Sequence, residues 1–267
     1  MLRNVALKGL RDVRRGFAWW SLGLVALAAL MVSVYPSVRD NPGLNKLVQD
    51  YPEALKGFIG FGGELDYVSP AGYLGSEVFA LMAPLLLLVA AIGGGAGAVA
   101  GEEERGTLDL LLAHPVSRRR VALEKLVSLV GELTGLALVL WLALLVGAKA
   151  VGMDISAEKL GAAVLSLLVL ALLFGALALL AGAATGHRAR AIGIVTAVAV
   201  AGYLVNALAP LAGPLKPLRP LSPFYHYTVG DPLRQGLAAW HVLLLLAAAA
   251  VFAALAPFAL ERRDLER

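Results

Sequence analysis

Six stretches of this 267-residue sequence are long and apolar enough to cross a lipid bilayer. A helix needs about 20 residues to span ~30 Å of hydrocarbon. The runs are continuously apolar, whereas the strands of a transmembrane barrel alternate between apolar and polar residues. We therefore predict an all-α, polytopic membrane protein, with six transmembrane helices near residues 17–35, 78–100, 126–148, 160–184, 191–212 and 238–260.

The composition supports this class and excludes others. Hydrophobic residues make up 59% of the chain and charged residues 16%, where soluble domains have about 25% charged residues. The absence of Cys excludes disulfides, thiolate metal sites and thiol nucleophiles. The net charge of +4 does not indicate a nucleic-acid partner, because the basic residues flank the apolar runs, as they do beside a lipid bilayer.

The distribution of Lys and Arg predicts an orientation. Fifteen of the 23 basic residues fall on one side when the six stretches cross the bilayer alternately. Excess basic residues stay in the cytoplasm, so we expect a multi-pass protein of the cytoplasmic (inner) membrane with both termini cytoplasmic. No linker divides residues 1–267, which predicts one transmembrane domain with an outer loop at 36–77.

The N-terminal residues 1–16 are basic and amphipathic. Apolar residues recur there at three- and four-residue steps, and Lys and Arg fill most of the remaining positions. Such a segment is typical of a helix that lies in the headgroup layer with its charges on anionic lipid. We expect an N-terminal interfacial helix, although a simple topology signal would have the same composition.

Glycines at four-residue steps predict close helix packing. Missing side chains let helix backbones approach, within the bundle or across a dimer. The same glycine-rich run lacks the Lys-Ser/Thr pair of a phosphate loop, so we expect no nucleotide site in this chain. The glycines concerned are Gly93, Gly97, Gly101, Gly131 and Gly135.

The segment between the second and third stretches is the most informative. We expect a short helix from about Glu102, because its acidic first turn suits the positive end of a helix dipole. Pro115 would end that helix, and Ser117 would cap a second helix that leads into the third span. The result is an amphipathic lever on the membrane surface; a solvated charged loop is the alternative. The apolar face of the expected helix would carry Leu108, Leu111 and Leu112.

One acidic residue and one asparagine within the predicted spans are candidates for function, and one late segment is rich in proline. Glu132 is six residues into the third span, where a carboxylate indicates function or pairing with a cation near the interface. For Asn206 we expect an interhelical hydrogen bond rather than a substrate contact. Residues 213–237 contain five prolines in an apolar context, which suggests an outer re-entrant segment supported by protein or water, or else a plain external loop.

The 102–118 segment reads Glu-Glu-Glu-Arg-Gly-Thr-Leu-Asp-Leu-Leu-Leu-Ala-His-Pro-Val-Ser-Arg. It resembles the signature of the type-2 ABC exporter (ABC-2 type) permease subunits. The resemblance extends to the six-span layout, the basic N-terminus and the sequence Leu-Ser-Pro-Phe-Tyr at 221–225. It covers most of the chain and does not specify a substrate.

The resemblance implies a permease subunit that is not itself an enzyme and binds no cofactor. ATP and Mg would be bound by a separate ABC ATP-binding subunit, present in two copies. A second permease subunit of the same sequence would complete a homodimer in the bilayer. The 102–118 segment would be the cytoplasmic coupling helix that docks on the ATPase. Residues implied in this coupling are Glu102, Glu104, Arg105, Gly106, Thr107, Leu108, Leu111, Leu112, Pro115 and Arg118.

The resemblance also implies that 213–237 is an external gate. Glu132, Asn206, Pro223, Phe224 and Tyr225 are the corresponding candidates for a transport path or gate. A mostly apolar interior suits lipid-like, amphipathic or drug-like cargo.

Two other classes remain as alternatives. An ion-coupled secondary transporter would need charged or broken-helix sites near mid-membrane, and this chain offers one shallow carboxylate without a matching partner. An intramembrane protease would need a different Glu-Arg spacing. The four His residues fall on both sides of the membrane, so we expect no metal site.

Overall fold

The computed structural model describes residues 5–41, 43–50, 66–106 and 118–262. Within these ranges the chain is helical and contains no strand, and six of its helices are long and apolar enough to span a membrane. The all-α, six-helix prediction is therefore confirmed. The long helices are α1 (Val5–Arg39), α5 (Ala83–Glu104), α7 (Arg118–Ala150), α8 (Ala157–Thr185), α9 (Arg188–Leu208) and α12 (Ala239–Arg262).

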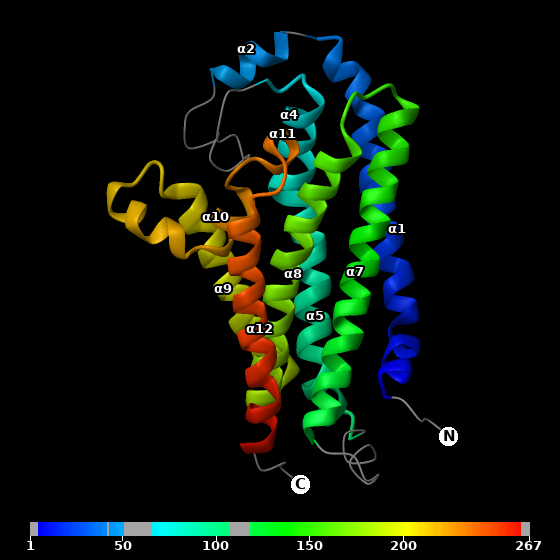
Figure 1. The fold of residues 1–267 in the computed structure, drawn as a ribbon, viewed down its shortest axis with the longest axis vertical. Coiled ribbons are helices and arrows are strands. Elements are labelled where there is room, and N and C mark those ends of the chain that lie inside the picture. Colours follow the sequence, from blue (N-terminus) through cyan, green and yellow to red (C-terminus); the bar gives the residue numbers. More distant parts are fainter. Residues whose placement is uncertain (1–4, 42, 51–65, 107–117, 263–267) are drawn as a thin grey trace.

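Short helices connect the long ones at one end of the bundle. The start of α1 and the end of α12 lie at the opposite end (Figure 1). We call the end with these two helix ends the proximal end, and the other the distal end. The distal elements are α2 (Gly43–Gln49), α4 (Pro70–Leu74), the 3-10 helix η2 (Gly213–Leu221), α10 (Pro223–Thr228) and α11 (Pro232–Gln235).

Three predicted boundaries differ from the structure. α1 runs without a break from Val5, so residues 5–16 continue the first span rather than form a separate helix. α9 ends at Leu208, four residues before the predicted end at 212, because Pro210 has no N–H to continue the helix. The second span begins earlier than 78, since α4 leads directly into η1 (Gly75–Met82) and α5.

The helix η1 is a π-helix at the distal start of the second span. Its last bond joins the Ala83 N–H to the Val78 carbonyl, five residues back. Continuing that pattern would pair the Phe79 carbonyl with the N–H of residue 84, which is a proline. Pro84 therefore leaves the Phe79 carbonyl without a backbone donor.

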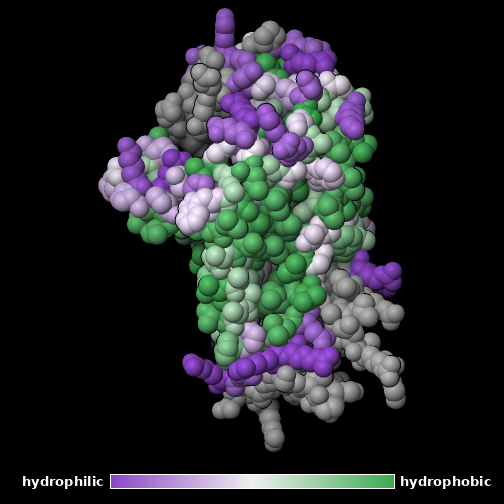
Figure 2. All heavy atoms as spheres, in the orientation of Figure 1, coloured by the Kyte–Doolittle hydropathy of each residue, from purple (hydrophilic) through white to green (hydrophobic). Residues whose placement is uncertain are grey.

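α8 is the central helix and packs on α5, α7, α9 and α12. Its contact with α5 is close because a Cβ at Gly95 would lie 2.3 Å from the Gly175 carbonyl oxygen. α1 lies at the edge of the bundle against α7, where a Cβ at Gly135 would lie 2.9 Å from the Phe17 ring. Figure 2 shows an apolar belt between polar proximal and distal ends, as expected of a chain that spans a bilayer.

Candidate functional site

The proximal end of α5 is where the structure departs most from the predicted coupling helix. Glu102, Glu103 and Glu104 form the last turn of α5 rather than the first turn of a new helix. Arg105 caps α5, and Gly106 follows with a left-handed φ of 67°, a conformation that glycine adopts without steric cost. The prediction that a helix begins at Glu102 is therefore wrong.

Three acidic residues at the negative end of a helix dipole need compensating charge, and Lys125 provides it for Glu102. The Lys125 ammonium donates to the Glu102 carboxylate, and both side chains are less than a tenth exposed. This ion pair joins the last turn of α5 to the second turn of α7. It thereby fixes the two helices on either side of residues 107–117.

Glu104 makes the second contact at this end. Its Oε1 accepts a hydrogen bond of 2.8 Å from the backbone N–H of Arg188, one of the N-terminal donors that a helix cannot satisfy by itself. The Arg188 side chain runs along α5, where Cβ atoms at Gly97 and Gly101 would lie 3.5 Å from its Nε and 3.7 Å from its Cδ. These two glycines thus accommodate an arginine from α9.

The other predicted packing glycines lie in different surroundings. A Cβ at Gly93 would meet nothing within 4 Å, whereas Gly135 contacts Phe17 of α1. Gly131 is exposed. The closest backbone approach in this stretch of α5 belongs to Gly95, which the four-residue spacing did not select.

A third contact joins α7 to the end of α12. Arg119 lies 2.7 Å from the Glu261 carboxylate, and its guanidinium stacks 4.8 Å from the centre of the Phe258 ring. Beneath these polar contacts, a small apolar cluster unites α5, α7, α8 and α12. Its buried members are Val99, Val121, Ala122, Leu179, Ala183, Ala256 and Leu260.

The proximal contacts therefore hold both flanks of the predicted coupling segment. We call the three contacts Glu102–Lys125, Glu104–Arg188 and Arg119–Glu261 the proximal frame. Arg118 begins α7, with its side chain outside the described residues. The remaining predicted coupling residues, Thr107, Leu108, Leu111, Leu112 and Pro115, also lie outside them.

Glu132 lies further along α7, facing α5. It is 9% exposed, and its Oε2 would be 3.6 Å from a Cβ placed at Gly94. Gly94 thus gives the carboxylate room beside the α5 backbone. The structure brings Glu132 together with neither Asn206 nor the 223–225 segment.

The distal gate candidates form one packed unit. Asn206 Oδ1 accepts from Arg219 Nε at 3.3 Å, which links α9 to η2. Ser222 caps α10 by accepting from the Phe224 N–H, and its Oγ donates to the Gly202 carbonyl at 2.7 Å.

The aromatic residues of α10 differ in burial. Phe224 is buried between the rings of Phe174 and Tyr203. Pro223 begins α10, and Tyr225 lies beside Arg219 at its surface.

Sequence reasoning missed a histidine pair at the distal end. The Nδ1 atoms of His226 and His241 lie 2.8 Å apart, and His226 Nε2 donates to the Pro220 carbonyl at 2.7 Å. A neutral His226 with its proton on Nε2 accepts from the Nδ1–H of His241. No sequence pattern indicates this pair, because α11 and its turns intervene. Among the described residues, no three metal-ligating side chains converge.

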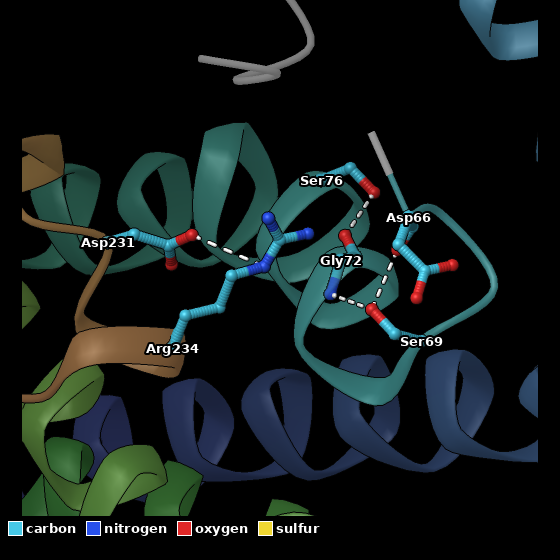
Figure 3. A network of polar contacts seen from close by, with 6 residues as sticks. All are labelled: Asp66, Ser69, Gly72, Ser76, Asp231 and Arg234. Carbon is cyan, nitrogen blue, oxygen red and sulfur yellow. Dashed lines mark hydrogen bonds and ion pairs between the residues drawn. The ribbon is translucent and has the colours of Figure 1, made fainter. Parts of the chain in front are cut away.

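A network on α4 and α11 completes the distal end (Figure 3). Ser69 Oγ donates to the Asp66 carbonyl at 2.7 Å and accepts from the Gly72 N–H at 3.1 Å, which caps α4. Arg234 pairs with Asp231 at 3.4 Å on α11. These contacts order the backbone and present no catalytic grouping.

A family profile described as ABC-2 family transporter protein matches residues 3–265, nearly the whole chain. The chain belongs to the ABC-2 transporter family. It is accordingly a membrane permease component of an ABC transporter, and the family implies association with an ATP-binding subunit. A search of curated proteins finds no match to this ABC-2 chain.

Proposed function

We propose that this ABC-2 permease is the membrane-spanning half of an ATP-driven exporter. Two copies pair in the cytoplasmic membrane, and each engages one separate ATP-binding subunit through residues 102–118. ATP and Mg are bound by that subunit, and this chain performs no catalysis. The observation that carries the proposal is the proximal frame, because it connects both flanks of the motif segment to four membrane helices.

The frame supplies a physical route for coupling. Closure of the ATP-binding subunits displaces the segment between Gly106 and Arg118. The buried Glu102–Lys125 pair makes α5 and α7 respond together, and the Arg119–Glu261 pair carries the displacement to α12. Packed helices move as rigid units between discrete arrangements, so a small displacement at the proximal end opens a path between the paired permeases.

Cargo follows from the chemistry of the interior. The central helix α8 consists mostly of alanine, leucine and glycine. Glu132 is a buried carboxylate at the α5–α7 interface. Such an interior favours lipid-like, amphipathic or drug-like molecules. Phe224 and its neighbours close the distal end as the gate.

Affinity purification of the tagged chain from its native host in mild detergent tests the assembly. We expect an ABC ATP-binding subunit at a one-to-one ratio, lost in the L111D/L112D variant. Leu47→Asp is the matched control, because Leu47 is 59% exposed on α2 at the distal end. A preparation without any ATPase, combined with transport driven by an ion gradient, would refute the proposal.

Orientation has its own test, because the chain contains no Cys. The test uses two single-cysteine variants, Lys46→Cys on α2 and Ala189→Cys at the start of α9, both at exposed positions. A membrane-impermeant maleimide added to intact cells should label Lys46→Cys and spare Ala189→Cys until the membrane is permeabilised. The reverse pattern would place the proximal end outside.

A further inference from the structure

The 3-10 helix η2 has an unusual sequence, Gly-Pro-Leu-Lys-Pro-Leu-Arg-Pro-Leu. A 3-10 helix has three residues per turn, so residues three apart lie on the same side. The nine residues therefore form three rows: a proline row, a leucine row and a cationic row. The rows are Pro214/Pro217/Pro220, Leu215/Leu218/Leu221 and Gly213/Lys216/Arg219, the last of which carries the two cations.

The leucine row lacks protein cover within the described chain. No residue of η2 is buried, and Leu218 and Leu221 are 44% and 77% exposed. Figure 1 shows η2 and α10 projecting sideways from the distal part of α9. Figure 2 shows this projection beside the distal border of the apolar belt. The leucines are therefore positioned to enter the edge of the hydrocarbon layer.

The proline row keeps η2 out of the hydrocarbon centre. In a 3-10 helix each carbonyl accepts from the N–H three residues on. The carbonyls of Pro214 and Pro217 have a proline at that position and receive no such bond. Bare carbonyls are costly in lipid, so η2 is suited to the hydrated headgroup layer.

The cationic row borders a groove of about 280 Å³ between α9, η2 and α10. Arg219 is held in place by Asn206 Oδ1 at 3.3 Å and by the Tyr225 ring, 5.3 Å from the guanidinium. The protein sequence contains no Asp or Glu from residue 159 to residue 230. Within the described residues neither cation forms a salt bridge. The groove lining is Ala209, Pro210, Lys216, Arg219, Pro220 and Tyr225.

We propose that this groove binds the phosphate of an anionic phospholipid, with the leucine row of η2 inserted among the acyl chains. The occupant follows from the pairing of a cationic row that has no acidic partner among the described residues with an exposed apolar row, which matches a charged headgroup attached to hydrocarbon. A second copy of the same surface would bring cations against cations. The proposal is independent of the ATPase, so it stands or fails separately from the export function.

Native mass spectrometry of the full-length chain in detergent tests this site, with dioleoyl phosphatidylglycerol and phosphatidylcholine as probes. We expect phosphatidylglycerol to bind more tightly than phosphatidylcholine, and to lose about fivefold in affinity for each cation removed in K216Q and K216Q/R219Q. K216Q alone is informative because Lys216 is exposed and does not support Asn206 or Tyr225. Leu221→Ser should weaken both lipids by a similar factor.

The matched control is K46Q/K159Q, which removes two exposed cations from the same end of the bundle. Equal losses in K46Q/K159Q and K216Q/R219Q would reduce the effect to general attraction and overturn the site. Displacement of phosphatidylglycerol by an equal concentration of inorganic phosphate would show a free-anion site instead. A change in dimer fraction with unchanged lipid binding would make the surface a protein interface, which also overturns the proposal.

Discussion

At the proximal end charged side chains join the ends of helices, whereas at the distal end tyrosine hydroxyls join helices to the backbone of distant segments. The proximal frame uses ion pairs such as Glu102–Lys125 and Arg119–Glu261. At the distal end Tyr35 donates to the Val68 carbonyl at 3.2 Å, and Tyr73 to the Met31 carbonyl at 2.8 Å. Two of the three proximal contacts join formal charges, whereas these distal tyrosine contacts join neutral groups.

Tyr227 is the clearest distal example. Its hydroxyl donates to the Phe79 carbonyl at 2.8 Å, across 148 positions of sequence. That carbonyl is the one deprived of a backbone donor by Pro84 and the π-helix. Burial raises the pKa of the Tyr227 hydroxyl above its ordinary value, so the phenol keeps its proton and remains a donor. The Tyr227–Phe79 hydrogen bond should therefore be insensitive to salt and to pH near neutrality, whereas exposed proximal pairs are screened by salt.

The largest expected effect comes from the buried proximal pair. Glu102→Ala leaves the Lys125 ammonium buried without its carboxylate and should lower the free energy of unfolding by about 3–5 kcal/mol. SDS titration of the purified chain in detergent measures this. Arg120→Gln, which breaks the pair between the exposed Arg120 and the partly exposed Glu124, should cost less, about 1 kcal/mol or below.

The apolar double variant E102L/K125M sharpens that comparison. Replacing both members of a buried pair removes the desolvation cost together with the attraction, so most of the lost stability should return. An equal loss in Glu102→Ala and Arg120→Gln would show that burial does not distinguish the two pairs.

A smaller effect is expected at the distal end. Tyr227→Phe leaves the Phe79 carbonyl buried without a donor and should cost about 1–3 kcal/mol, measured by the same titration. Tyr225→Phe is the control, because its ring contact with Arg219 survives the loss of the hydroxyl.

Pro84→Ala provides a double-mutant cycle for this bond. It restores an N–H at residue 84 that can serve the Phe79 carbonyl, so Tyr227→Phe should cost less than half as much in the Pro84→Ala background. Additive losses would mean that Pro84 is not the reason for the contact.

The number and type of membrane helices were predictable because hydropathy over about 20 residues is a local property. The register of helix contacts was not. A four-residue glycine spacing identifies one face of a helix, here the face of Gly93 and Gly97. Gly95, two positions from each of them, makes the closest approach because α8 lies on its side of α5. Which neighbour a face meets depends on tertiary packing, which one sequence does not specify.

The proximal site shows the same limit. The acidic run at 102–104 fits a helix N-terminus by the dipole rule, yet it ends α5, because Lys125 and the Arg188 N–H compensate the charge from elements 23 and 84 residues away. A local electrostatic rule is overridden when distant groups supply the opposite charge. The motif at 102–118 still identified the family, since a motif does not depend on the helix boundary.

The smallest expected effect is at the exposed proximal pair. Arg119 and Glu261 are 54% and 36% exposed, so Glu261→Gln should cost at most about 1 kcal/mol at low salt. Raising the ionic strength from about 0.05 to 0.5 M shortens the Debye length from roughly 14 Å to 4 Å, and the difference between wild type and Glu261→Gln should fall toward zero. The cost of Tyr227→Phe should not change over the same range, because neither the Tyr227 hydroxyl nor the Phe79 carbonyl carries a charge. If the two variants respond to salt alike, the distinction between the charged Arg119–Glu261 pair and the neutral Tyr227–Phe79 bond is lost.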